Sequence, residues 1–447
     1  MIEGPLASGM IKYAVPILLS SLIQLFFNAA DVAVVGRFSG PDALAAVSAS
    51  GPVANLVIQL FIGMSVGANV LCAQFDGGRK RENFEKAVHT AITVAALCGI
   101  FLMLAGMLVA KPVLRLSGAP AEILPLSALY LRIYFVGVPF SLVYNFGAAI
   151  LRSVGDTRKP LQYLTIAGAL NVVLNVFFVA ALGMGVAGVA TATAVSQATS
   201  ATLVIRDMLR TDRNYRLDPK KLHIDTNILL RMLGIGIPAG IQNSSFSIAN
   251  LLIQSAVNSF GSTVMAASAI ALSIESFCFV GVEALGQAAL TFTGQNYGAG
   301  NYKRIGHILR DALAMELATG IALGDLAYFL APWLMRIYTT DPEVMAYARE
   351  IMFIVCVFGF ITCFMSVPFN ILRGINHSVY PMICTILLVC VLRVVWVLTV
   401  FAHFRTLTVL YMAWPVTKAC AGIAGFIGFF IYYRRLLKSQ RISPSAS

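Results

Sequence analysis

Charge is scarce in this chain, and its scarcity excludes several classes of protein. Only 12% of the 447 residues are charged and 58% are hydrophobic, and the mean hydropathy is +0.82. A soluble domain of this length does not carry so much apolar surface, so the composition indicates a polytopic membrane protein. The sequence also lacks a G-x-x-x-x-G-K-[ST] loop and a soluble segment to house one, which argues against an ATP-driven pump.

Patterns typical of metal sites and of membrane-embedded enzymes are missing as well. The eight cysteines lie in or beside apolar runs without C-x-x-C spacing, and the five histidines are scattered. No apolar run brings a histidine and carboxylates together as a catalytic site requires. We therefore expect no disulfide, no metal centre, no cofactor and no enzymatic activity.

Twelve apolar segments of helical length are separated by glycine, proline or clusters of charge. Each is long enough to cross a bilayer as a helix. They lie near 10–36, 44–73, 87–110, 125–151, 160–182, 186–206, 228–258, 264–293, 308–331, 344–372, 381–403 and 407–433.

The second half of the sequence repeats the first. The segment ILRSVGDTRKP, which contains Arg152, recurs as ILRGINHSVYP with Arg373, a shift of 221 residues. At the same shift Gln74-Phe-Asp-Gly-Gly recurs as Gln295-Asn-Tyr-Gly-Ala. Because each copy has an even number of spans, we predict an all-α protein of two six-helix lobes related by a pseudo-two-fold axis along the membrane normal. The predicted parts are an N-lobe over 1–206, a cytoplasmic linker over 207–227, a C-lobe over 228–433 and a cytoplasmic tail over 434–447.

The basic residues are distributed by topology. The net charge is +12, but the bases lie in short loops between spans and do not form one soluble face. If both termini face the cytoplasm, most of the 32 Lys and Arg residues fall on that side, as the positive-inside rule requires. We therefore predict a multi-pass protein of the plasma (inner) membrane with both termini cytoplasmic. We expect it to be a monomer. Its expected partners are the lipid bilayer and small-molecule substrates, and we expect it to bind no nucleic acid.

One carboxylate, Asp31, is set inside the first apolar run. An Asp at mid-membrane costs about 2.5 to 3.5 kcal/mol on insertion scales, so it indicates function. Arg37 ends the run about 9 Å further on, at about 1.5 Å per residue. Gln24 and Asn28 precede Asp31 at spacings that place all three on one helix face. The alternative is a polar seam that joins this helix to a neighbour.

The seventh span repeats that polar face without the charge. Its members are Asn243, Ser247, Asn250 and Gln254, and Asn250 stands near the position that corresponds to Asp31. We expect both polar faces to line a substrate cavity between the lobes.

The charges within the second half lie in later spans. Four of them are Glu275 and Glu283 in the eighth span, Arg393 in the eleventh and Lys418 in the twelfth. Two acids and two bases predict a neutral buried network, because pairing removes the cost of isolated charges. The alternative that Glu275 or Glu283 is a second coupling site stays open.

Several of these features together resemble the multidrug and toxic compound extrusion (MATE) family. They are the loop GQNYGAGNYKRI from Gly294 to Ile305, its weaker twin AQFDGGRKREN, and Asp31 in the first span. The resemblance covers nearly the whole chain. It implies a cation-coupled antiporter, driven by H⁺ or Na⁺, that exports amphipathic, cationic small molecules by alternating access.

Two other carriers are alternatives. A flippase of lipid-linked oligosaccharides belongs to the same superfamily but usually has two more spans. A major-facilitator-type carrier also has twelve spans, but here Cys72 stands where the leading glycine of its loop motif belongs.

The resemblance also implies a cation site in the first lobe. The family uses the first-span Asp, two polar residues four apart on the fifth span and a Thr on the sixth, and these match Asp31, Asn171, Asn175 and Thr193. Pro16 lies where the first helix of the family is thought to bend. Some members have a second carboxylate where this chain has Asn175, so the site carries at most one negative charge. A single charge favours a proton as the coupling ion, although Na⁺ at Asp31 stays open. The alternative that the two Asn merely join helices also stays open.

Overall fold

The computed structural model describes residues 1–116 and 120–442, and the side chains of these except positions 41, 52–57, 252, 441 and 442. Regular structure in these ranges is helical throughout. The first half contains α1 (Leu6–Phe38), α2 (Gly40–Gly77), α3 (Arg81–Leu116), α4 (Leu124–Ser153), α5 (Arg158–Asn175), the π-helix η1 (Val176–Ala181) and α6 (Gly185–Arg210).

The second half begins after the short 3₁₀ turn η2 (Pro219–Lys221). It contains α7 (Thr226–Asn258), α8 (Ser262–Gly298), α9 (Tyr302–Phe329), α10 (Ala331–Arg336), α11 (Pro342–Val355), η3 (Val357–Phe360), α12 (Ile361–Gly374), α13 (Val379–Thr385), η4 (Ile386–Val391), α14 (Leu392–Trp396), η5 (Val397–Phe401) and α15 (Leu407–Ile442). Eleven helical segments of the described chain are long and apolar enough to cross a membrane, and α7, with 33 residues, makes a twelfth long helix. The all-α prediction is confirmed.

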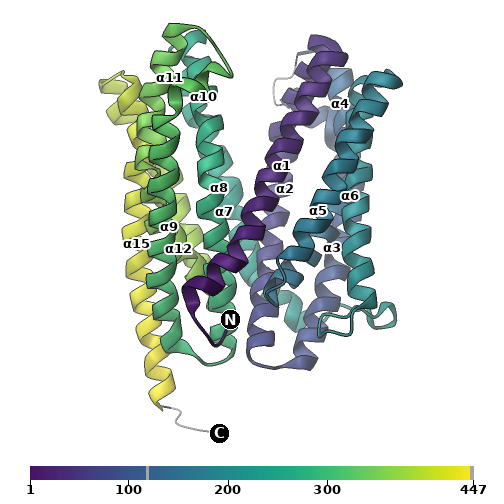
Figure 1. Ribbon diagram of the computed structural model, residues 1–447, viewed down its shortest axis with the longest axis vertical. Helices are drawn as coiled ribbons and strands as arrows, with labels where there is room; N and C mark the ends of the chain where they lie inside the picture. The colour runs from purple at the N-terminus through teal and green to yellow at the C-terminus, as the bar shows by residue number, and fades with distance from the viewer. Residues whose placement is uncertain (117–119, 443–447) are drawn as a thin grey trace. The chain divides into compact units, whose positions relative to one another are not determined.

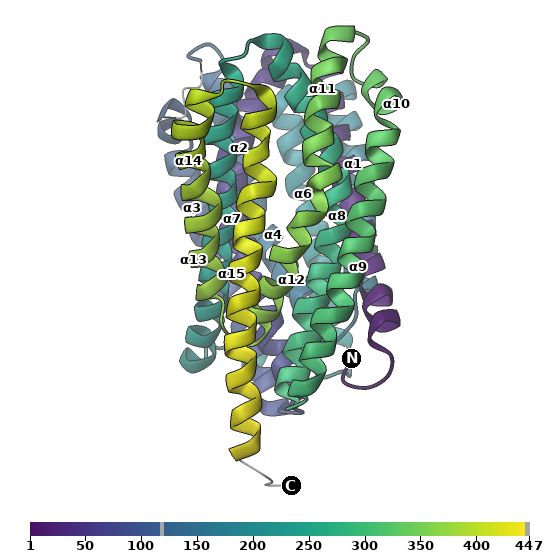
Figure 2. The ribbon, with the colours of Figure 1, turned by 90° about the vertical axis from the view of Figure 1, so that its left-hand side faces the viewer.

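The chain forms two compact units whose boundaries fall inside helices. One unit is Met1–Leu18 with Ile241–Ser447, and the other is Leu19–Gly240. Figure 1 shows α3, α4, α5 and α6 of the second of these as neighbouring rods, and Figure 2 shows α9, α11, α12 and α15 of the first. Relative to the predicted lobes, the units therefore exchange the first parts of α1 and α7.

Close helix contacts account for both exchanges. In Leu19–Gly240, a Cβ on Gly63 of α2 would lie 2.2 Å from Cα of Gly240 on α7, so only glycine permits this approach. In the other unit, the Tyr13 hydroxyl of α1 lies 2.8 Å from the Thr291 hydroxyl of α8, and the Tyr13 ring meets Phe292 edge to face. Each helix start is thus fixed by packing within its unit.

The sequence repeat is also a repeat of backbone conformation. The π-helix η1 begins at Val176 and η5 begins at Val397, 221 residues later. Residues with positive φ recur at the same shift in three pairs, namely Gly40 and Gly261, Arg79 and Gly300, and Gly155 and Asn376. Two copies of one helical unit, with the same turns, therefore make up the chain.

The linker between the halves is held on α3. The backbone N–H of Asp218 donates to Nε2 of His89 at 3.0 Å, and Nδ1 of that ring lies 2.8 Å from the Glu85 carbonyl. Lys221 pairs with the Glu85 carboxylate at 2.8 Å, and this hydrogen bond raises the pKa of the Lys221 amine. The linker is docked on the helix end by specific polar contacts.

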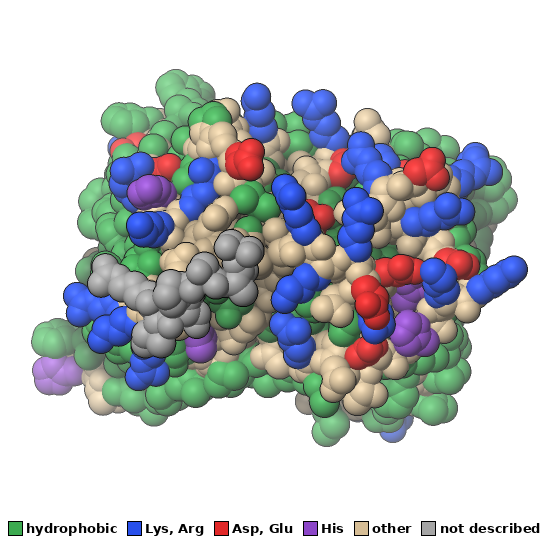
Figure 3. Space-filling model, turned by 90° about the horizontal axis from the view of Figure 1, so that it is seen from below, with side chains coloured by type: hydrophobic (Ala, Val, Ile, Leu, Met, Phe, Trp, Pro, Cys, Tyr) green, Lys and Arg blue, Asp and Glu red, His purple; other side chains and the backbone are tan. Residues whose placement is uncertain are grey.

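Figure 3 shows Lys and Arg side chains over one end of the helices, with hydrophobic side chains along the rim of that view. This is the end at which α2 turns into α3 and where the linker lies.

Candidate cation site

Three of the four predicted site residues form one polar cluster in Leu19–Gly240. Asp31 of α1 is half-buried and accepts a hydrogen bond from Nδ2 of Asn175, the last residue of α5. The same Nδ2 donates to Oδ1 of Asn171 at 3.1 Å. Asn175 is completely buried and Asn171 is nearly so. Their spacing of four residues on α5 is what places both amides on one face.

A glycine lets α1 approach α5 at this site. A Cβ on Gly168 would lie 1.6 Å from Cε2 of Phe27, so the Phe27 ring lies against bare backbone. Phe27 precedes Asp31 by one helical turn, and Gly168 precedes Asn171 by nearly one turn. The contact therefore sets the depth and spacing at which the carboxylate meets the amides.

The orientation of the Asn175 amide is fixed by its partners. With Nδ2 directed at Asp31 and Asn171, Oδ1 is buried and has no hydrogen-bond partner among the described residues. Turning the amide over would point its oxygen at two other oxygen atoms. The structure thus holds an N–H toward the carboxylate and leaves one buried acceptor beside it.

Thr193 and the polar face of α1 stand apart from this hydrogen-bonded cluster. The Thr193 hydroxyl donates to the Val189 carbonyl of its own helix at 3.0 Å. Gln24 and Asn28 are exposed on α1, on the face that leads to Asp31. Both precede Asp31 on the same helix face, Asn28 by about one turn and Gln24 by about two.

Sequence analysis missed two tyrosines of α4 that face Asp31. Tyr130 and Tyr134 are stacked with ring centroids 6.1 Å apart, and the Asp31 charge acts on both hydroxyls. Gln197 of α6 is a hydrogen-bonding neighbour of Tyr134 and lies one turn after Thr193. Tyrosines in an apolar span resemble core residues, so the only signal was the Thr193 to Gln197 spacing on one face of α6.

The polar face of α7 lies in the other unit. Oδ1 of Asn250 accepts from Nη1 of Arg393 at 3.1 Å, and Gln254 donates to Asn258 at 3.1 Å. Asn243 and Ser247 are half-buried on the same helix. One member of this face therefore binds a fixed cation of the protein itself.

The four predicted charges of the second half fall into two groups. Glu275 acts electrostatically on both Lys418 and Arg393. Arg393 is 1% exposed, and its guanidinium lies over the Trp414 ring at 4.7 Å. Glu283 is exposed and acts on a different base, Arg373 of α12, which sequence analysis counted among the loop residues.

The second copy does not repeat the cluster of the first. A shift of 221 residues carries Asn171, Asn175 and Thr193 to Leu392, Trp396 and Trp414. Apolar side chains thus stand where the first copy has amides and a hydroxyl. The cluster of two amides around a carboxylate is therefore a feature of the first copy.

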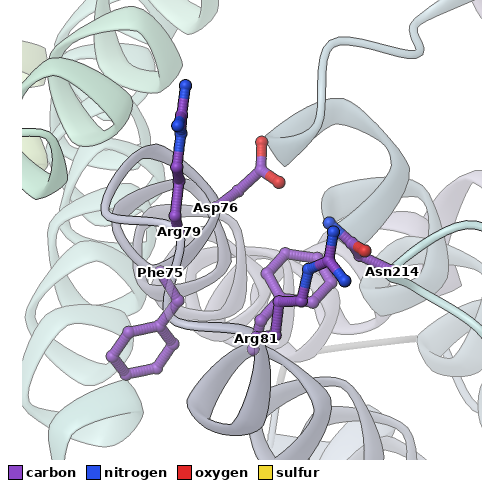
Figure 4. Close-up of a pocket in the computed structure, with 6 residues that line it drawn as sticks. Phe75, Asp76, Arg79, Arg81 and Asn214 are labelled. Carbon is purple, nitrogen blue, oxygen red and sulfur yellow. The ribbon is translucent and has the colours of Figure 1, made fainter.

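A separate polar cavity of about 330 Å³ lies where α2 turns into α3 (Figure 4). Asp76 and Asn214 point toward each other across it and interact as hydrogen-bonding neighbours. Its lining residues are Phe75, Asp76, Arg79, Arg81, Phe84 and Asn214. It lies among the basic residues of the helix ends and is distinct from the Asp31 cluster.

The fold and the cluster define a class of protein first: a multi-pass helical membrane protein with a polar cluster around a carboxylate, Asp31, inside its helices. The MatE family model matches residues 16–177 and again 238–399, and the chain therefore belongs to the MatE family. The two matches fall on the two copies of the repeat.

Curated relatives and solved structures agree with this assignment. The chain is 29% identical over 355 residues to the Probable multidrug resistance protein YoeA of Bacillus subtilis (strain 168), which covers 77% of this chain and 76% of that protein. It is 27% identical over 443 residues to the Probable multidrug resistance protein YpnP of the same organism, covering 97% and 96%.

A solved structure described as the outward-facing conformation of a multidrug resistance MATE family transporter of the MOP superfamily has the same fold. It matches with a TM-score of 0.91 and 23% identity, covering 98% of both chains. The predicted family and the predicted fold class, twelve helices in two lobes, are confirmed.

Proposed function

We propose that the protein is a secondary transporter that exports amphipathic, cationic small molecules in exchange for a cation that binds at Asp31. The multidrug-resistance names of its relatives support the export of drug-like compounds. The observation that carries the proposal is the cluster of Asp31, Asn175 and Asn171 within the helices. A carboxylate at this depth is costly in free energy, and it is useful where a cation must be bound and released.

A single carboxylate can couple two cations by exchange. Gln24 and Asn28 are exposed on the face that leads to Asp31, so a cationic substrate can bind the amides and the carboxylate together. A coupling cation on Asp31 neutralises that charge and removes the attraction. Because the two bind in exclusion of each other, each promotes release of the other, which is the thermodynamic basis of antiport.

We propose a proton as the coupling ion. Asn175 presents an N–H to Asp31, and its contact with Asn171 holds that orientation. An N–H suits a carboxylate that gains and loses a proton, whereas Na⁺ requires oxygen atoms directed at it. The cluster has one negative charge, which one proton neutralises.

The test is export from proteoliposomes in which a pH gradient and a sodium gradient are imposed separately. We expect the pH gradient to drive export of a cationic dye, and Asp31→Asn to abolish it while the protein stays folded, because the change keeps shape and removes the charge. Asp42→Asn is the matched control, since Asp42 is exposed at the start of α2. Full gradient-driven export by Asp31→Asn would refute the site, and export that follows sodium at fixed pH would refute the proton.

A further inference from the structure

A second carboxyl group, Glu316, is buried in the unit formed by Met1–Leu18 and Ile241–Ser447. It lies on α9 and is 0% exposed. It is 14 residues after Tyr302, the first residue of α9, which corresponds to about 21 Å at about 1.5 Å per residue. It is also 13 residues before Phe329, the last residue of α9, so it lies near the middle of a helix long enough to span a hydrocarbon core about 30 Å thick. The Asp31 site does not use it.

Three polar side chains converge beside Gly286 of α8, where the missing side chain leaves room. A Cβ there would lie 2.6 Å from Nδ2 of Asn370, 3.0 Å from Oγ of Ser366 and 3.3 Å from Oε1 of Glu316. Ser366 is the hydrogen-bonding neighbour of the carboxyl group, although neither Glu316 oxygen has a partner at normal geometry among the described residues. The carboxyl group therefore belongs to a small polar cluster with Ser366 and Asn370 beside Gly286.

The side chains of α12 form a line of hydrogen-bond donors that points toward Glu316. Nη1 of Arg373 donates to Oδ1 of Asn370 at 3.2 Å, and Nδ2 of Asn370 donates to Oγ of Ser366 at 3.4 Å. The Ser366 O–H is left to donate to the carboxyl group. The positive charge of Arg373 thus polarises the line in the direction that stabilises a negative Glu316.

Other charged and titratable groups lie on the helices that contact α9. Glu316 acts electrostatically on the Cys363 thiol of α12, and Glu283 of α8 acts on Arg373. The charged and thiol groups that α8, α12 and α15 contribute within their spans are Glu275, Cys278, Glu283, Cys363, Arg373, Lys418 and Cys420. Arg373, reached through Asn370, is the base that the hydrogen bonds connect to Glu316.

We propose that Glu316 is a second proton-binding site of this transporter, with the polar cluster beside Gly286 as the place where its proton is taken up and released. Burial favours the protonated carboxyl group, and the donor line from Arg373 makes the deprotonated form accessible within the membrane. Both states therefore have a structural basis. The inference rests on the proposed function only in that proton binding is taken to serve transport.

The donor set argues for a proton and against a metal cation. Asn370 directs its N–H₂ group toward Gly286, and its oxygen accepts a hydrogen bond from Arg373. A Na⁺ ion there would meet an amide donor and a nearby guanidinium, both repulsive. A proton needs only the carboxyl oxygens.

The test counts protons on the purified transporter in detergent, by acid titration between about pH 9 and pH 5 with an indicator dye. We expect Glu316→Gln to bind about one proton fewer per chain than the unmodified protein, and Asp31→Asn likewise, with the double variant losing about two. Monodispersity and thermal melting confirm that each variant is folded. An unchanged proton count for folded Glu316→Gln would refute the inference.

The same measurement separates this inference from the proposed function. If Asp31→Asn keeps both its proton count and its export, the proposed function fails, while a lost proton in Glu316→Gln still supports the second site.

Two further variants test the polar cluster beside Gly286 if Glu316→Gln does not fold. Gly286→Ala fills the space between the three polar groups, and we expect it to shift the pH at which the Glu316 proton binds. Gly281→Ala is the matched control, because its Cβ would meet only Leu323 and Thr319 carbons, at 3.0 and 3.2 Å. Ser366→Ala removes the last donor of the line, so proton binding should move to higher pH, whereas Ser273→Ala, whose hydroxyl binds its own helix at 2.7 Å, should not change it. Identical titrations for Gly286→Ala, Ser366→Ala and their controls would also refute the inference.

Discussion

Asn175 determines how much charge the cluster in the first half holds. It is completely buried and joins Asp31 to Asn171 through one amide nitrogen. A neutral residue here limits the cluster to a single carboxylate. The number of cations that the cluster can neutralise follows from this one side chain.

We predict that Asn175→Asp changes the pH dependence of export. It would place two carboxylates in contact, and because like charges disfavour ionisation, one of them should hold its proton to higher pH. The pH optimum of export from proteoliposomes should rise by about one unit or more. Asn258→Asp is the control, since Asn258 is exposed at the end of α7. The same pH profile for Asn175→Asp and the unmodified protein would count against a proton at this site.

Sequence predicted residues whose chemistry is unusual for their depth and missed residues whose chemistry is common. Asp31, Asn171 and Asn175 were found because a carboxylate and two amides in apolar runs stand out. Tyr130 was not found, because only the fold shows that its hydroxyl faces Asp31. Glu316 lies within the predicted span 308–331. The cost of a carboxylate inside a membrane span, which singled out Asp31, indicates Glu316 equally.

Among the elements, the contact of α1 with α5 depends on Gly168. Phe27 occupies the space that a side chain would take, and Asp31 follows one turn later. The geometry of the cluster therefore depends on a residue that carries no polar group.

We expect Gly168→Ala to impair coupling without altering any polar residue. The added methyl group would overlap the Phe27 ring and push α1 away from α5, separating Asp31 from Asn175, at a cost of about 1 to 3 kcal/mol. Gradient-driven export in proteoliposomes should be reduced, because the separated Asp31 loses part of its function. Gly234→Ala, whose added Cβ meets nothing within 4 Å, should export normally. Equal export by the two variants would show that the contact is dispensable.

Helix positions followed from hydropathy, but helix type did not. The predicted span 264–293 corresponds to α8, Ser262–Gly298, because both ends are marked by glycine turns. The π-helices η1 and η5 and the 3₁₀ turn η3 lie inside predicted spans without any signal in the sequence. Hydropathy reports which residues are apolar, and the hydrogen-bond register within a span depends on packing.

For the whole molecule, the composition of the two units determines which pieces of the chain can fold. Met1–Leu18 packs with Ile241–Ser447, and the start of α7 packs with the first half of the chain. The sequence repeat did not predict this exchange, because the repeat is defined by copies and the units are defined by contacts. The predicted lobe boundaries at 206 and 228 thus mark the two copies of the repeat, whereas the compact units have boundaries inside α1 and α7.

We predict that the chain divided after Leu222, within the exposed part of the linker, yields two fragments that fold only together. Fragment 1–222 lacks the start of α7, and fragment 223–447 lacks the start of α1. Co-expressed with a tag on one fragment, the two should co-purify and export a cationic dye, whereas each alone should aggregate. A monodisperse fragment 1–222 with a cooperative melting transition would contradict this.

The matched π-helices also suggest where the lengths of related sequences can change. A π turn holds one residue more than an α turn, so a lineage can lose a residue within Val176–Ala181 by reverting that turn to α-helix. Asn171 and Asn175 precede this segment and would keep their register. A deletion between them would rotate one amide by about 100° relative to the other and disconnect it from Asp31. Among sequences that descend from the duplicated half, insertions and deletions should therefore accumulate in the π segments and avoid the three residues between Asn171 and Asn175.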